Sequence, residues 1–153
     1  MPNHFHFLVH ANAGSIIEVK DGSFPRQQFS QGIKQLLSSY TKSINNELGF
    51  TGSLFQQKTK ALCVEDEREF FGTTTFHYIH QNPFKAGLVK RMEDWEFSSF
   101  RDYVGLRNGT LCNKTMALQF LDLDVVTLYN DSYNVINDES LVKILECPIP
   151  KGN

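Results

Sequence analysis

The stretch Phe70-Phe71-Gly72-Thr73-Thr74-Thr75-Phe76-His77-Tyr78-Ile79-His80-Gln81-Asn82-Pro83 has the residue spacing of a helix. Its aromatic and apolar side chains recur at intervals of three and four, which is the helical period. Asp66 is a suitable N-cap with Glu69 three residues later, so the helix is predicted to begin there. Because the ring of Pro83 disfavours helical geometry at Asn82, the helix is predicted to end at Pro83.

One face of this predicted helix carries side chains that can act as a nucleophile or as a metal ligand. Thr74, Tyr78 and Asn82 are four residues apart and therefore lie along the same face. A phenol nucleophile and a carboxamide oxygen, which can ligate a metal ion, would then point into one site. The alternative is that Tyr78 is an amphipathic tyrosine at the boundary of the core.

The chain begins Met1-Pro2-Asn3-His4-Phe5-His6-Phe7-Leu8-Val9, and residues 4–10 alternate in character as a strand does. Residues two apart on a strand lie roughly 6.5 to 7 Å apart at Cα, so His4 and His6 face the same way and could ligate one ion. The alternative is that two histidines occur by chance on an exposed strand face.

A third segment is predicted to be a packed helix that ends at Gly49. Tyr40 falls within its apolar stripe, so it is interpreted as a core residue rather than as a nucleophile. The stripe consists of Phe29, Ile33, Leu36, Leu37, Tyr40, Ile44 and Leu48.

Further segments match, in order, the motifs of one known family. They are Ser39-Tyr40-Thr41-Lys42 followed by Asn45, Gly52-Ser53-Leu54-Phe55-Gln56-Gln57-Lys58, Tyr78-Ile79-His80-Gln81-Asn82-Pro83-Phe84-Lys85-Ala86-Gly87-Leu88-Val89 and Asp94-Trp95-Glu96-Phe97-Ser98-Ser99-Phe100. Together with the opening histidines they resemble the single-tyrosine HUH transposases, specifically the REP-associated tyrosine transposases. Lys58 stands where the family usually has arginine, and Phe55 stands where it usually has tryptophan.

The resemblance implies that His4, His6 and Asn82 ligate a divalent cation and that Tyr78 is the nucleophile. The family's activity is cleavage and strand transfer of single-stranded or hairpin DNA through a 5′-phosphotyrosine. The histidines favour Mn²⁺, and Mg²⁺ fits if DNA phosphates and waters complete the shell. The resemblance leaves open whether the site forms within one chain or across a homodimer. Candidate DNA-binding residues are Lys42, Lys58, Lys60 and Lys85.

The fold implied by the resemblance is α+β, a ferredoxin-like antiparallel sheet with helices on one face. The family's domain carries a strand, a helix and a second strand before the histidine motif, whereas this chain begins inside that motif and so lacks those N-terminal strands. The transposase domain is predicted to span residues 1–103. Residues 104–153 are predicted to be a variable C-terminal extension with short helices at Met116–Leu121 and Ser140–Leu145.

The composition fits one soluble core of ordinary size, with 41% hydrophobic residues in 153. The net charge is −2, but residues 1–117 carry 13 Lys and Arg against 11 Asp and Glu, and the remainder carries 2 against 6. The three cysteines are widely spaced, and no apolar run has the length of a membrane span or a signal peptide. These features predict a cytoplasmic protein with no membrane partner.

Two other function classes are consistent with parts of the sequence. The first is a catalytically inactive, truncated DNA-binding relic of such a transposase, which would bind DNA without forming a covalent adduct. The second is a metal-independent phosphoesterase with His-x-His motifs. That class uses two such motifs, and this sequence has one.

Overall fold

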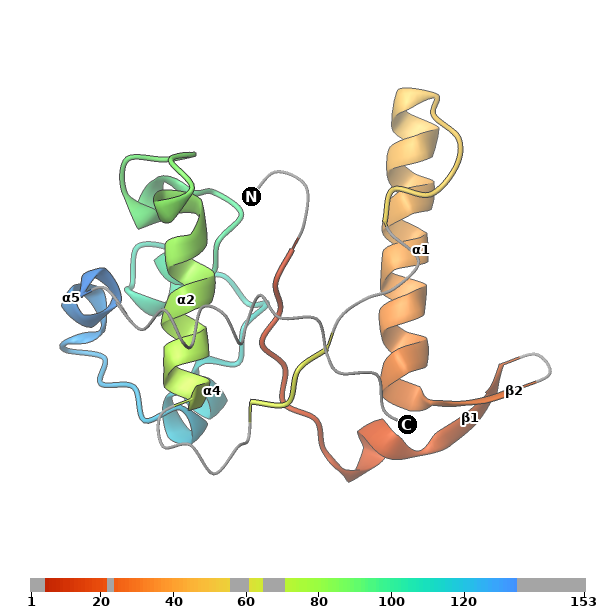
Figure 1. Ribbon diagram of the computed structural model, residues 1–153, viewed down its shortest axis with the longest axis horizontal. Helices are drawn as coiled ribbons and strands as arrows, with labels where there is room; N and C mark the ends of the chain where they lie inside the picture. The colour runs from red at the N-terminus through yellow and green to blue at the C-terminus, as the bar shows by residue number, and fades with distance from the viewer. Residues whose placement is uncertain (1–4, 22–23, 56–60, 65–70, 135–153) are drawn as a thin grey trace. The chain divides into compact units, whose positions relative to one another are not determined.

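The computed structural model describes residues 5–21, 24–55, 61–64 and 71–134 (Figure 1). The chain divides into two compact units. One unit is Val9–Lys60, and the other combines Met1–Leu8 with Ala61–Asn153. The second unit contains Tyr78 and most of the buried side chains.

The unit of residues 9–60 is a hairpin followed directly by a long helix. The short 3₁₀ helix η1 (Ala13–Ile16) leads into β1 (Glu18–Asp21), which pairs antiparallel with β2 (Phe24–Gln27). Helix α1 (Gln28–Leu48) begins at the next residue. The Gln28 amide donates a 2.8 Å hydrogen bond to the Ile17 carbonyl, which ties the start of the helix to the hairpin.

Helix α1 confirms the predicted helix and its end. Gly49 has φ +68°, the left-handed conformation that favours glycine, and its amide donates to the Asn45 carbonyl. The predicted burial is wrong, because no residue of α1 is buried and Tyr40 is 55% exposed. A two-stranded hairpin is too small to cover the apolar stripe of a long helix. The Tyr40 ring lies 5.9 Å from the Phe55 ring.

The second unit is organised around α2 (Phe71–Lys85). It also contains η2 (Met92–Asp94), α3 (Phe100–Tyr103), α4 (Lys114–Phe120) and α5 (Leu128–Tyr133). Figure 1 shows α4 and α5 next to α2, which carries more buried residues than any other element described. The apolar core of this unit consists of Phe71, Phe76, Met92, Phe100 and Leu128.

Helix α2 does not end at Pro83, as the sequence had predicted. It continues to Lys85, and the amides of Ala86 and Leu88 donate to the carbonyls of Asn82 and Pro83 at 2.9 and 3.0 Å. Proline removes one amide donor from the ladder, and later amides can still close the last turn. Gly87, with φ +69°, follows the helix. The predicted start at Asp66 lies outside the described residues, and the described helix begins at Phe71.

The strand predicted for residues 4–10 is not found in the described part, where Phe5–Asn12 lie outside any helix or strand. The described residues contain one sheet, in which β1 pairs with β2 and this segment is not a strand partner. An isolated strand is not stable without such a partner. The broad α+β class is confirmed as a small antiparallel sheet combined with helices.

The region after Tyr103 forms helices, as expected. Helix α4 confirms the helix predicted at Met116–Leu121, and the Asn113 side chain caps it by accepting a 3.0 Å hydrogen bond from the Met116 amide. The helix predicted at Ser140–Leu145 lies outside the described residues. Among the described helices, none is long and apolar enough to cross a membrane.

Candidate functional site

Tyr78 and Asn82 occupy consecutive turns of α2, and both are partly buried. Phe76 and His80, two residues before and after Tyr78, are buried in the core. Because each helical residue advances by about 100°, Tyr78 lies on the side of α2 away from those two residues. Phe71 and Thr75, seven residues before Tyr78 and Asn82 and so on the same face, are buried as well, which places the phenol and carboxamide at the margin of the core.

The structure brings His6 next to Tyr78. Their ring centroids are 6.1 Å apart, and the ring planes meet at 85°, an edge-to-face arrangement. Both residues belong to the same compact unit, although they are far apart in the sequence. His4 lies outside the described residues, so the contact concerns one histidine of the predicted pair.

The side chain of Asn82 has an unusual environment. Its Nδ2 atom is buried and has no hydrogen-bond partner in the part of the chain that the structure describes. Buried polar atoms are normally paired. Rotation of the amide exchanges its oxygen and nitrogen, so this position could present an oxygen lone pair to a cation. An imidazole and a carboxamide oxygen suit Mn²⁺ or Mg²⁺. The described residues contain no group of three or more His, Cys, Asp or Glu side chains placed to hold a metal ion.

The predicted DNA-binding lysines are divided between the two units. Lys42 is exposed on α1, and Lys85 is exposed in the last turn of α2. Lys58 and Lys60 lie outside the described residues. Of the lysines described, Lys85 is therefore the one that shares a helix with Tyr78 and Asn82.

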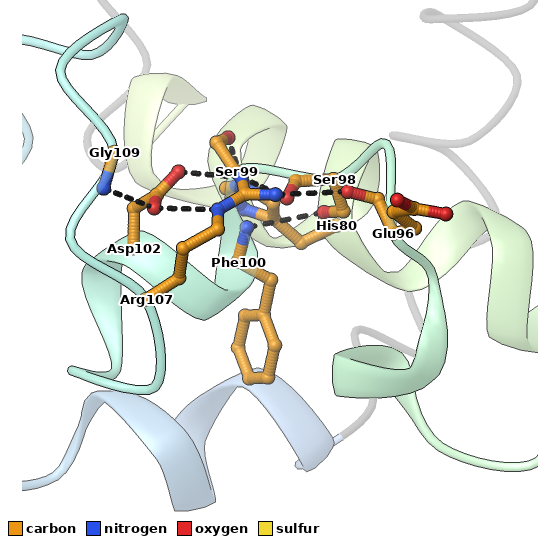
Figure 2. Close-up of polar contacts among 8 residues, drawn as sticks. All are labelled: His80, Glu96, Ser98, Ser99, Phe100, Asp102, Arg107 and Gly109. Carbon is orange, nitrogen blue, oxygen red and sulfur yellow. Dashed lines mark hydrogen bonds and ion pairs between the residues drawn. The ribbon is translucent and has the colours of Figure 1, made fainter.

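His80, in contrast, is a buried packing residue. It is 4% exposed, and its Nε2 lies 2.8 Å from the Ser99 hydroxyl oxygen (Figure 2). Burial lowers the pKa of His80 to about 4, because a charged imidazolium is poorly solvated in the core. At neutral pH the imidazole is therefore uncharged. His80 therefore serves packing in the core.

A clamp around Arg107 was not anticipated from the sequence. Its guanidinium donates to both carboxylate oxygens of Asp102, at 2.8 and 2.6 Å, and to the carbonyls of Glu96 and Ser98, both at 2.9 Å (Figure 2). The Gly109 amide donates to Asp102 as well. The Arg107 guanidinium holds the pKa of Asp102 at about 2. The clamp fixes the loop that leads from Trp95 into α3.

Gly109 shows how tightly this clamp is built. A Cβ at this position would lie 2.6 Å from a carboxylate oxygen of Asp102. The close approach lets the Gly109 amide reach the carboxylate at 2.9 Å. The pair Asn108-Gly109 marks a turn in the sequence, but the sequence does not reveal which side chain the turn approaches.

A second polar cluster joins η2 to α5. The hydroxyls of Tyr129 and Tyr133 donate to the two carboxylate oxygens of Glu93, at 3.0 and 2.5 Å, and Tyr133 accepts a hydrogen bond from the Met92 amide. Burial raises the pKa of Tyr133, and the hydrogen bond to Glu93 raises it further. These phenols are structural groups and are poorly suited to act as nucleophiles.

No protein-family model, curated protein or solved structure matches this chain.

Proposed function

We propose that the chain is a DNA endonuclease and strand transferase of the single-tyrosine HUH type, which cleaves single-stranded DNA through a 5′-phosphotyrosine. The observation that carries the proposal is the edge-to-face contact of His6 with Tyr78 at 6.1 Å. The sequence resemblance assigns both residues to one site. Their contact in the structure is an independent observation. The partly buried Asn82, one turn beyond Tyr78, supports the same site.

Tyr78 would act as the nucleophile. Its phenolic oxygen forms a bond to the phosphorus of a phosphodiester, the bond from phosphorus to the 3′ oxygen breaks, and the phenol proton is lost to solvent. The leaving 3′ oxygen takes up a proton and becomes a hydroxyl. Attack by that hydroxyl, or by another 3′ hydroxyl, on the phosphotyrosine reverses the step and joins strands.

His4, His6 and Asn82 would hold a divalent cation, Mg²⁺ or Mn²⁺. When bound, such a cation supplies electrostatic stabilisation of the charge that develops on the phosphate oxygens. The edge contact with His6 also restricts rotation of the Tyr78 ring, so the phenol is positioned before DNA binds. Lys42, Lys58, Lys60 and Lys85 are proposed to contact DNA phosphates.

The proposal includes the family's ferredoxin-like sheet, which is larger than the described hairpin. A partner chain, as in a homodimer, could supply strands that pair with residues 4–10. A cytoplasmic location agrees with the cysteine spacing. The end of the transposase domain near Tyr103 stays a prediction.

A catalytically inactive DNA-binding relic is the second candidate. Its support is the absence of a strand at Phe5–Asn12 in the described structure. Without a sheet to hold them, His4 and His6 would not be fixed at one spacing, and a cation would bind weakly. This candidate predicts DNA binding without covalent chemistry.

The deciding experiment looks for a covalent adduct. The chain is incubated with hairpin DNA from the flank of its own gene and Mn²⁺ or Mg²⁺, then denatured. The DNA is labelled at its 3′ end, because a 5′-phosphotyrosine retains the fragment that carries this end. We expect a labelled protein band that requires the cation and disappears when the cation is chelated.

Tyr78→Phe should reduce the adduct below detection, since the nucleophilic oxygen is gone. Tyr40→Phe is the matched control, because Tyr40 is also a helical tyrosine but is exposed on α1. An adduct that persists in Tyr78→Phe would exclude this nucleophile. DNA binding by the unmodified chain with no adduct would favour the relic.

A further inference from the structure

A cavity of about 560 Å³ lies among α3, α4 and α5, in the same unit as Tyr78. Small-molecule sites typically have volumes of about 300 to 1,000 Å³. The cavity is lined by two tyrosines, one lysine and several aliphatic side chains. None of these residues has a part in the proposed cleavage step.

One wall of the cavity is a tyrosine ring held in place. The Tyr129 hydroxyl donates to Glu93 at 3.0 Å, and its ring lies 5.2 Å from the Tyr133 ring and 5.9 Å from the Phe100 ring. The side chain is nevertheless 40% exposed. The ring therefore has a fixed orientation and an accessible surface before any ligand arrives, which lowers the entropic cost of binding.

The second tyrosine of the lining, Tyr103, is held by packing on α2. Its ring packs edge-to-face on Phe76 of α2, with centroids 4.8 Å apart and planes at 90°. The aliphatic side chains of the lining are those of Val104, Leu118, Val125 and Val126, and Val125 is exposed. A flat ring that entered the cavity would meet these aromatic and aliphatic surfaces.

The charge available in the cavity is positive. Lys114 lines it, is partly buried, and interacts electrostatically with Asp102, whose pKa it helps to lower, although no salt bridge within 4.0 Å joins Lys114 to another described residue. The Asp102 carboxylate also borders the cavity, but Arg107 and the Gly109 amide already occupy both of its oxygens. The Lys114 ammonium is thus positioned to bind an anion that accompanies a flat ring.

From these features we infer that the cavity binds one unpaired nucleotide of a single DNA strand, with its base stacked on Tyr129 and its phosphate near Lys114. The inference rests on the proposed function for its choice of ligand. Base stacking on aromatic side chains combined with a nearby cation is the usual chemistry of single-strand recognition.

The location places this nucleotide away from the cleaved bond. Tyr103 packs on Phe76, and Phe76 and Tyr78 lie about 200° apart around α2. A helix with its side chains is about 10 to 12 Å across. A DNA strand that reaches from Tyr78 to the cavity must therefore pass around α2. The cavity would thus hold a flanking nucleotide rather than a nucleotide at the cleaved bond.

The test measures binding of a fluorescent oligo-dT strand to the chain with Tyr78→Phe, so that covalent chemistry does not contribute. Tyr129→Leu should weaken binding about tenfold through the loss of stacking, whereas Tyr129→Phe, which keeps the ring, should bind within about twofold of the parent. Circular dichroism of each variant checks that the fold is retained.

Lys114→Gln should reduce the slope of log affinity against log salt by about 0.7, the value for one phosphate contact on a single strand. Lys20→Gln is the control for charge alone. It removes the same charge as Lys114→Gln, but Lys20 is exposed on β1 in the other unit. It should leave the slope unchanged.

Three results would overturn the inference. They are parent-like binding by both Tyr129→Leu and Lys114→Gln, equal affinity for duplex DNA, and competition by free dTMP as strong as that of the strand. Adduct formation by the chain with Tyr78 intact is measured separately. If the adduct forms but Tyr129→Leu and Lys114→Gln bind like the parent, the nucleotide site is rejected and the proposed function stands. If both variants weaken strand binding as expected but no adduct forms, the nucleotide site stands and the proposed cleavage is rejected.

Discussion

At the scale of single residues, the five tyrosines are distinguished by their surroundings rather than by their chemistry. Burial raises the pKa of Tyr103 to about 12, and Tyr129 and Tyr133 both donate to Glu93. A phenol must lose its proton during attack, so a buried or donating phenol is a poor nucleophile. Tyr78 lies beside the imidazole of His6, whereas the imidazole beside Tyr103 is that of His80, which is buried in the core.

The buried carboxylate of Asp102 provides a test at this scale. Asp102→Asn should lower the melting temperature at neutral pH by several degrees, because it removes the charged partner of Arg107. The pKa of Asp102 is about 2 in the folded chain and higher when unfolded. The carboxylate therefore adds stability above pH about 3.8 that is lost as the pH falls toward 2.

Thermal melts at several pH values measure the difference between parent and Asp102→Asn. We expect a gap at pH 7 that narrows as the pH falls from about 3.8 to 2. Asp94→Asn is the control, since Asp94 pairs with Arg91 in an exposed position and should change the melt little. A gap that stays constant down to pH 2 would contradict the assignment.

At the scale of elements, the two long helices end by different means. Helix α1 ends at Gly49, which is left-handed, and α2 continues for two residues beyond Pro83, to Lys85, before Gly87. Proline deletes a donor without preventing the following residues from adopting helical angles. A left-handed glycine, in contrast, turns the backbone out of the helix.

Two glycines of this region make a matched pair of variants. Gly49→Ala should destabilise α1 by about 1 kcal/mol, because an L-residue is strained at φ +68° even though its Cβ would meet no atom within 4 Å. Gly32→Ala, in the interior of α1 with equally open surroundings, should stabilise it by about 0.5 to 1 kcal/mol. Denaturant unfolding followed by far-ultraviolet circular dichroism measures both. Equal effects of the same sign would show that α1 does not end at Gly49.

At the scale of the whole molecule, residues beyond Tyr103 help to build the core around α2. Leu128 and Ser132 of α5 are 1% and 0% exposed. The Ser132 hydroxyl lies 2.9 Å from His77 Nδ1, and its carbonyl accepts a 2.8 Å hydrogen bond from Gln81. The segment 104–134, which the sequence predicts to belong to a variable extension, is therefore part of the same folded unit as α2.

This packing predicts the effect of shortening the chain. A chain of residues 1–103 should lose its fixed tertiary structure, because it exposes Phe100 and lacks the buried leucine of α5, which alone contributes about 2 kcal/mol. A chain of residues 1–134 should retain it. Near-ultraviolet circular dichroism of Trp95 and binding of a hydrophobic dye compare the two. A cooperative melt of the shorter chain like that of the longer one would contradict the prediction.

Sequence patterns predicted the positions of helices better than they predicted the tertiary contacts around them. The spacing in α1 and the glycine after it predicted that helix and its end, and α4 formed where an apolar run suggested one. Helical spacing also put Tyr78 and Asn82 on one face. The alternation in residues 4–10 was misleading, because a strand requires a neighbouring strand and the described residues supply none there.

By itself, then, the sequence determined local geometry: which residues are helical, which share a face, and where a glycine ends a helix. These features depend on interactions between residues that are close together in the sequence. The tertiary structure decided that Tyr40 is exposed, that Arg107 clamps Asp102, and that His6 meets Tyr78. Such contacts depend on which distant segments pack together, and residue spacing along the chain carries no direct record of that.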